Sequence, residues 1–149
     1  MNAAMNAAAT VVVRRTITAP PEALFDAWLD ADALAIWMRP TGIRQTFAKT
    51  EPRVGGSYEI TMHGDEKIHP HHGVYQVIDR PRRLVFTWVS HATEGAATLV
   101  TVDFLPKGER TEVVVTHEQL PEAAREAHTR GWTSGIERLA TFCTPQGST

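Results

Sequence analysis

The alternation of apolar and polar residues predicts β-strands through the middle of the chain. Residues 10–18 read TVVVRRTIT, in which β-branched residues dominate, as is typical of strands. Tyr58, Ile60 and Met62 alternate with polar neighbours, so this strand has one apolar and one polar face. Similar segments, separated by short turns, occupy residues 43–49, 73–79, 84–90, 98–105 and 111–117. A run of strands joined by short turns predicts an antiparallel sheet of about six or seven strands.

Helical periodicity marks two further regions. The first begins at Pro21, which suits the first turn of a helix, and Asp30 or Asp32 can cap a second short helix that ends at Trp37. The second region is residues 121–143, the longest periodic segment. Its apolar stripe contains His128, Trp132, Gly135, Ile136, Leu139 and Cys143, and the residues mostly opposite include Glu137 and Arg138. One strand, two short helices, further strands and one long C-terminal helix predict the α+β class.

Length and composition predict one globular domain. The 149 residues are 42% hydrophobic and 21% charged, so the chain can form a core. We expect a disordered leader at residues 1–9, a single domain at 10–144 and a disordered tail at 145–149. The net charge of −2 argues against nucleic acid as a partner, and no apolar run approaches the roughly 20 residues of a membrane span. A single cysteine, Cys143, excludes an internal disulfide and favours a cytoplasmic location.

Residues 62–75, MHGDEKIHPHHGVY, hold four of the seven histidines. A zinc site requires three or four ligands held at rigid spacing. His71 and His72 are adjacent, so an extended chain would point them to opposite faces. At most His63, His69 and His71 could form a surface cluster. We therefore interpret the segment as a polar hairpin loop without a bound metal, and leave adventitious metal binding open.

Aromatic residues and glycines on the apolar faces suggest an internal cavity. Large aromatic side chains could surround one space, and Gly131 and Gly135 would leave room beneath the last helix. Each glycine costs about 1 kcal/mol relative to alanine inside a helix. Tyr58 or His128 could orient a ligand. The predicted cavity lining is Trp37, Tyr58, Ile60, Tyr75, Phe86, Trp88, His128, Gly131, Trp132, Gly135 and Ile136.

The order of elements and several sequence words resemble a known family. The words include TITAPPEALFDAWLD, IWMRP, GGSYEITM, HHGVYQVIDRPRRLVFTW and RGWTSGIERLATF, and they extend over residues 11–142. Together they resemble homologues of the activator of heat-shock-protein-90 ATPase, within the START-like (SRPBCC, birch-pollen-allergen-like) superfamily. The resemblance implies a helix-grip fold, in which a curved antiparallel sheet wraps around a long C-terminal helix. Relatives of this fold include lipid carriers, polyketide cyclases and stress-linked proteins.

Three functions remain open at this level. The favoured one is binding of an apolar or amphipathic small molecule in the cavity, without a cofactor and without catalysis. The second is an enzyme of cyclase or hydratase type, which requires an acid–base pair inside the same cavity. The third is an interaction module for a chaperone or regulator, which would present an exposed apolar patch. The residues leave the ligand and the oligomeric state open, including a homodimer.

Overall fold

The computed structural model describes residues 8–144, and its elements follow the predicted order. Its strands and helices are β1 (Ala9–Ile17), α1 (Pro21–Leu29), α2 (Ala31–Trp37), β2 (Gln45–Thr50), β3 (Ser57–His63), β4 (Ile68–Asp79), β5 (Arg83–Ser90), β6 (Thr98–Lys107), β7 (Arg110–Leu120) and α3 (Arg125–Cys143). Short 3₁₀ turns lie at His91–Thr93 and Glu122–Ala124. The predicted α+β helix-grip fold is confirmed.

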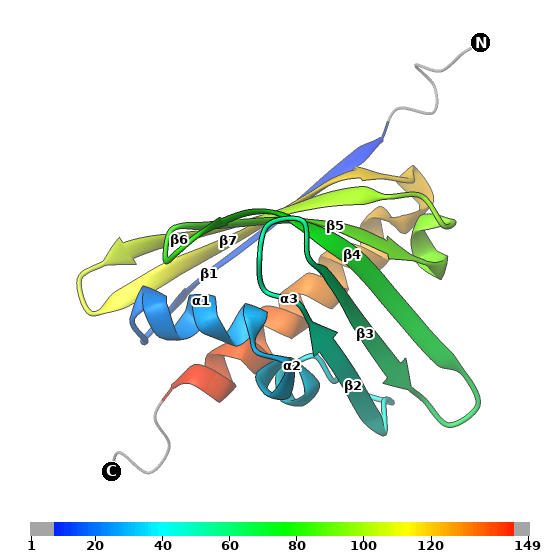
Figure 1. The fold of residues 1–149 in the computed structure, drawn as a ribbon, viewed down its shortest axis with the longest axis horizontal. Coiled ribbons are helices and arrows are strands. Elements are labelled where there is room, and N and C mark those ends of the chain that lie inside the picture. The colour runs from blue at the N-terminus through cyan, green and yellow to red at the C-terminus, as the bar shows by residue number, and fades with distance from the viewer. Residues whose placement is uncertain (1–7, 145–149) are drawn as a thin grey trace.

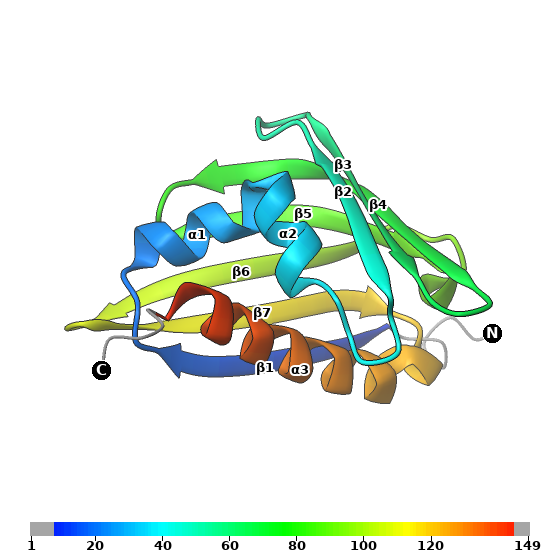
Figure 2. The same cartoon turned by 90° about the horizontal axis from the view of Figure 1, so that it is seen from below.

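Within residues 8–144 the seven strands form one antiparallel sheet in the order β1-β7-β6-β5-β4-β3-β2. The sheet is strongly curved, and all three helices lie on its concave side (Figure 1). Buried residues alternate with less buried ones along β6, as the period of two in the sequence predicts. Seen from below, α3 runs beside β1 and β7, while α1 and α2 lie beneath the middle strands (Figure 2). This arrangement leaves α3 and the bent β2–β3–β4 end of the sheet facing each other.

Local sequence signals explain the helix boundaries. Pro21 is the first residue of α1, where its missing N–H is not needed. The Asp30 carboxylate accepts a hydrogen bond of 2.9 Å from the backbone N–H of Ala33, so Asp30, rather than Asp32, caps α2. The region beginning at residue 121 starts with a 3₁₀ turn, and α3 itself begins only at Arg125. No helix among the described residues is both long enough and apolar enough to cross a membrane.

Aromatic rings fill the core between the short helices and the sheet. Trp28 of α1 packs edge-on against Trp37, with ring centroids 4.8 Å apart, and stacks on Trp132 of α3 at 5.8 Å. Tyr58 of β3 and Phe86 of β5 meet edge-on, with ring centroids 5.5 Å apart, over the strand β4 that lies between them. Such pairs contribute beyond the area that they bury. The core is therefore continuous from α1 to the middle of the sheet.

The structure corrects three boundaries. The histidine segment is not a loop: β4 begins at Ile68, five residues before the predicted strand, and Gly64–Lys67 alone connects β3 to β4. Pro70 is tolerated because this part of β4 pairs with β3 only, so its missing donor disrupts no second ladder. β1 runs one residue earlier than predicted, from Ala9, which is buried and pairs with Leu120, and β7 is longer than predicted because it continues to Leu120. Residues 1–7 of the predicted leader and the tail, residues 145–149, lie outside the described residues.

Candidate functional site

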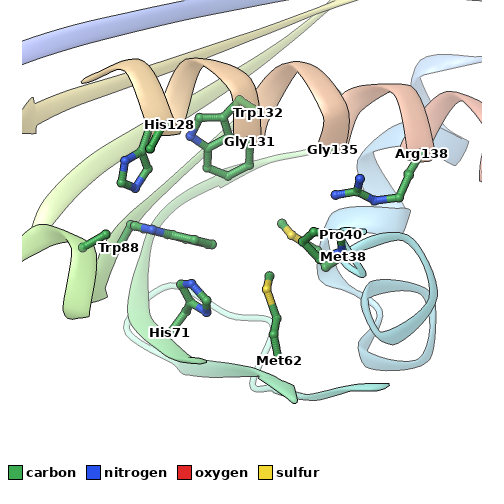
Figure 3. Close-up of a pocket in the computed structure, with 12 residues that line it drawn as sticks. Met38, Pro40, Met62, His71, Trp88, His128, Gly131, Trp132, Gly135 and Arg138 are labelled. Atoms are coloured by element: carbon green, nitrogen blue, oxygen red, sulfur yellow. The ribbon is translucent and has the colours of Figure 1, made fainter. Parts of the chain in front are cut away.

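A pocket of about 250 Å³ opens between α3 and the β3–β5 end of the sheet. Its walls come from α3, from the segment that follows α2, and from β3, β4, β5 and the 3₁₀ turn after β5. Figure 3 shows the α3 side chains facing those of the sheet across the pocket. The lining residues are mainly apolar, with two histidines and one arginine: Met38, Pro40, Met62, His71, Trp88, Ala92, Ala127, His128, Gly131, Trp132, Gly135 and Arg138.

His71 enters the pocket from β4. Its Nδ1 lies 3.1 Å from the backbone carbonyl oxygen of Ile60. A carbonyl only accepts hydrogen bonds, so Nδ1 donates and the Nε2 of the neutral ring is left as an acceptor. Burial lowers the pKa of His71, and the neighbouring His69 and His128 lower it further, while the hydrogen bond to Ile60 acts in the opposite direction. The imidazole is therefore neutral at neutral pH.

His128 enters the same pocket from α3. Its Nδ1 lies 2.9 Å from the carbonyl oxygen of Ala124, one turn earlier, and donates to it. As in His71, this leaves Nε2 of the neutral ring as an acceptor. The His128 ring also meets the ring of His117 edge-on, with centroids 5.0 Å apart. The pocket thus receives two imidazoles that are both held in place by backbone carbonyls.

His117 lies behind the pocket and is completely buried. Trp132 Nε1 donates to His117 Nδ1 at 3.0 Å, so Nδ1 carries no proton and Nε2 does. Nε2 donates to the Thr98 hydroxyl at 2.7 Å, and that hydroxyl donates to the Trp88 carbonyl at 2.6 Å. This series of hydrogen bonds fixes His117 as a neutral tautomer and links two tryptophans of the pocket wall.

We expect this buried imidazole to make the protein less stable in acid. Burial, and secondarily the nearby His128, lower the pKa of His117 from 6.5 to about 3. The unfolded chain therefore binds more protons below pH 6.5, and stability is lost as the pH falls from 6.5 towards 3. The slope approaches about 1.4 kcal/mol per pH unit. Denaturant unfolding at several values between pH 5 and neutrality measures this slope.

His117→Gln provides the comparison for this prediction, because the glutamine amide can donate and accept hydrogen bonds but does not titrate. In the variant, the slope of the free energy of unfolding against pH is expected to be smaller by up to about 1.4 kcal/mol per pH unit, the contribution of one proton. The slope that remains includes His71, whose pKa is also lowered. Equal slopes in wild type and variant would contradict the prediction.

The residues predicted to line a cavity divide into three groups. Trp88, His128, Gly131, Trp132 and Gly135 lie at the pocket. Tyr58, Ile60, Tyr75 and Phe86 instead surround a space of only about 10 Å³, which they fill together with side chains of α1 and α2. Trp37 and Ile136 are buried in the core and border neither space.

The sheet residues around the small space do not line the pocket because α1 and α2 occupy the space in front of them. The Tyr58 hydroxyl donates to the Thr87 carbonyl at 2.6 Å, so it is engaged within the sheet and does not reach the pocket. Trp37 Nε1 likewise donates to the Ala27 carbonyl at 2.9 Å. These rings stabilise the fold rather than form the pocket.

Several pocket residues were not anticipated. Met62 shares the apolar face of Tyr58 and Ile60, and that alternation could have identified it. His71 was assigned to a loop, so its direction could not be inferred. Arg138 was placed on the polar face of the last helix, but it lies one turn after Gly135 and its side chain borders the pocket.

Other candidate chemistry lies apart from the pocket. Among residues 8–144 no group of three His, Cys, Asp or Glu side chains could hold a metal ion. His71 and His72 do point to opposite faces of β4, as their adjacency predicts. Burial raises the pKa of the Cys143 thiol to about 11, and its Sγ lies 3.8 Å from the Ala23 carbonyl. Such a thiol is a poor nucleophile at neutral pH.

Solved structures share this fold over almost the whole chain. Protein CV1439 from Chromobacterium violaceum is 26% identical, with a TM-score of 0.82 over 92% of this chain and 98% of its own. SA2116 from Staphylococcus aureus, described as a protein of unknown function, is 16% identical, with a TM-score of 0.81 over 95% and 96%. CalU16 from Micromonospora echinospora is 20% identical, with a TM-score of 0.70 over 93% and 78%.

No curated protein matches the chain. One family model, described as "Activator of Hsp90 ATPase homolog 1-like protein", matches residues 18–143. The match runs from the end of β1 to the end of α3, so it includes every residue that lines the pocket. The chain therefore belongs to the family of Activator of Hsp90 ATPase homolog 1-like proteins.

Proposed function

We propose that the protein binds a small apolar or amphipathic molecule in the pocket between α3 and the β3–β5 end of the sheet. The observation that carries this proposal is an open space of about 250 Å³ whose walls are mostly methionine, tryptophan and alanine side chains. Burying apolar ligand surface there contributes about 25 cal/mol per Å². The volume lies just below the roughly 300–1,000 Å³ of most ligand pockets, so we expect a ligand of one or two rings.

The helix wall supports the same proposal. A methyl group added at Gly131 would meet nothing within 4 Å, and one added at Gly135 would make only ordinary contacts. Both glycines line the pocket. Neither is required by a close approach of another element, although each lowers helix stability by about 1 kcal/mol relative to alanine. Space for a ligand gives these positions a function.

A neutral probe tests the proposal. We expect 3-phenylpropan-1-ol to bind with one-to-one stoichiometry and a Kd on the order of 100 μM, a reasonable affinity for so small a ligand. Calorimetry measures the affinity. Trp88 and Trp132, which line the pocket, should change their fluorescence on binding. Absence of binding by this probe and by its acid analogue would contradict the proposal, and would favour a surface that binds a protein partner, such as a chaperone.

A second candidate, an enzyme of cyclase or hydratase type, rests on a different observation. His71 and His128 both line the pocket, and each has Nδ1 bound to a backbone carbonyl and Nε2 available. Two such imidazoles could serve as acid and base. The test is to incubate any ligand that co-purifies with the protein with the wild type and with a His71→Phe, His128→Phe variant. Consumption of the ligand by the wild type alone supports catalysis, whereas no consumption leaves binding as the function.

A further inference from the structure

Arg138 is a half-buried cation at the edge of the pocket. Within residues 8–144 no Asp or Glu oxygen lies within 4.0 Å of its guanidinium. The adjacent Glu137 is instead 3.8 Å from Arg15. Burial lowers the pKa of Arg138, but an arginine stays protonated in proteins. A buried charge is costly unless it is paired, so this cation is available to an anion.

The hydrogen bonds of Arg138 fix the direction of the guanidinium. Nε donates to the Trp37 carbonyl at 2.8 Å, and Nη1 donates to the Ser134 hydroxyl at 2.6 Å. Among residues 8–144 Nη2 has no hydrogen-bond acceptor, and it lies 3.8 Å from the position of a methyl group on Gly135. Because Gly135 lines the pocket and Ser134 does not, Nη2 is the nitrogen on the pocket side. Figure 3 shows the guanidinium directed along α3 into the pocket.

We propose that the ligand is an organic acid with a single negative charge, held by Arg138 at one end of the pocket. This inference rests on the proposed function, since it names the ligand class of the same pocket. The remaining N–H groups of an arginine suit a carboxylate, and such charge-assisted hydrogen bonds are stronger than neutral ones. Among the described residues that line the pocket, Arg138 is the one arginine or lysine, so a dianion such as a phosphate ester would keep an uncompensated charge. The apolar body of the acid would lie between Met38, Met62 and Trp88.

A matched pair of probes tests the charge preference. 3-Phenylpropanoate and 3-phenylpropan-1-ol share the same ring and chain and differ at the end group. We expect the wild type to bind the acid about tenfold more tightly than the alcohol, which corresponds to about 1.4 kcal/mol. In Arg138→Met the ratio of the two Kd values should fall to about one. Taking the ratio removes effects that act equally on both probes.

Arg130→Met is the control, because Arg130 lies on the same helix, is exposed and is 3.6 Å from Glu126, away from the pocket. It should retain the wild-type ratio. Arg138→Lys keeps the positive charge and should retain part of the preference for the acid over the alcohol. It therefore separates loss of the charge from poor folding of the Arg138→Met variant. A wild-type ratio near one, or an unchanged ratio in Arg138→Met, overturns the inference while binding of the alcohol still supports the pocket. Binding of neither probe contradicts the proposed function itself.

Discussion

Replacing Gly135 with leucine is expected to weaken the binding of 3-phenylpropan-1-ol by at least about 30-fold, while the free energy of unfolding changes by less than about 1 kcal/mol. The first added carbon would lie 3.8 Å from Arg138 Nη2 and 4.0 Å from Trp37 Cζ3, which are ordinary contacts. The remaining carbons would extend into the pocket and occupy the site of the probe. New contacts and better helix propensity would offset the strain of a larger residue.

Gly135→Ala separates occlusion of the pocket from other effects. It adds one methyl group at the same position, so binding should stay within about threefold and stability should rise by up to about 1 kcal/mol. Calorimetric titration and denaturant unfolding of the three proteins give both quantities. A loss of about 1–3 kcal/mol in Gly135→Leu would indicate overpacking of a filled core. That result, or wild-type affinity in the leucine variant, would contradict the prediction.

Replacing Gly73 with alanine is expected to destabilise the protein by about 3 kcal/mol or more, the largest effect on stability that we predict. A methyl group there would collide with the carbonyl oxygen of Thr87 on β5 and with the ring of Tyr58. Neither can move freely, because β4 and β5 are paired on both sides of this point and the Tyr58 hydroxyl is bound to the same Thr87 carbonyl at 2.6 Å. Glycine in a strand interior often marks such a close approach of backbones.

Gly131→Ala is the matched control for this substitution. Both changes add one methyl group to a glycine, but the methyl group at Gly131 would meet nothing within 4 Å. It should therefore stabilise the protein by up to about 1 kcal/mol through helix propensity. Denaturant midpoints measured side by side test the opposite signs. Equal effects of the two substitutions on stability would show that the close approach of Gly73 to Thr87 does not exclude a side chain at position 73.

The sequence by itself determined the elements and their order. The alternation of Tyr58, Ile60 and Met62 set the buried face of β3. Pro21 marked the start of the first short helix, and the pair Asp30 and Asp32 marked the start of the second. These features depend on neighbours within a few residues, because side-chain direction follows a period of two in strands and 3.6 in helices. The order of elements and the matching sequence words were enough to predict the helix-grip fold and the family.

Tertiary structure decided where space remains. Periodicity shows which face of an element is buried, but it does not show whether another element fills the space in front of that face. Thus Tyr58, Tyr75 and Phe86 lie against one another and against α1 and α2, whereas Trp88 and Trp132 border an open pocket.

The polar residues of the pocket depended on the fold in the same way. His71 faces inward because β4 extends to Ile68, and this extension results from pairing with β3 across a short turn. Arg138 follows the polar pattern of a solvent-facing residue, yet its guanidinium reaches the pocket because Gly135 leaves the helix surface open beside it. A long side chain can lay its stem along apolar surface and place its charge elsewhere. Contacts between distant segments therefore determined the site, because no local pattern encodes which side chains meet across it.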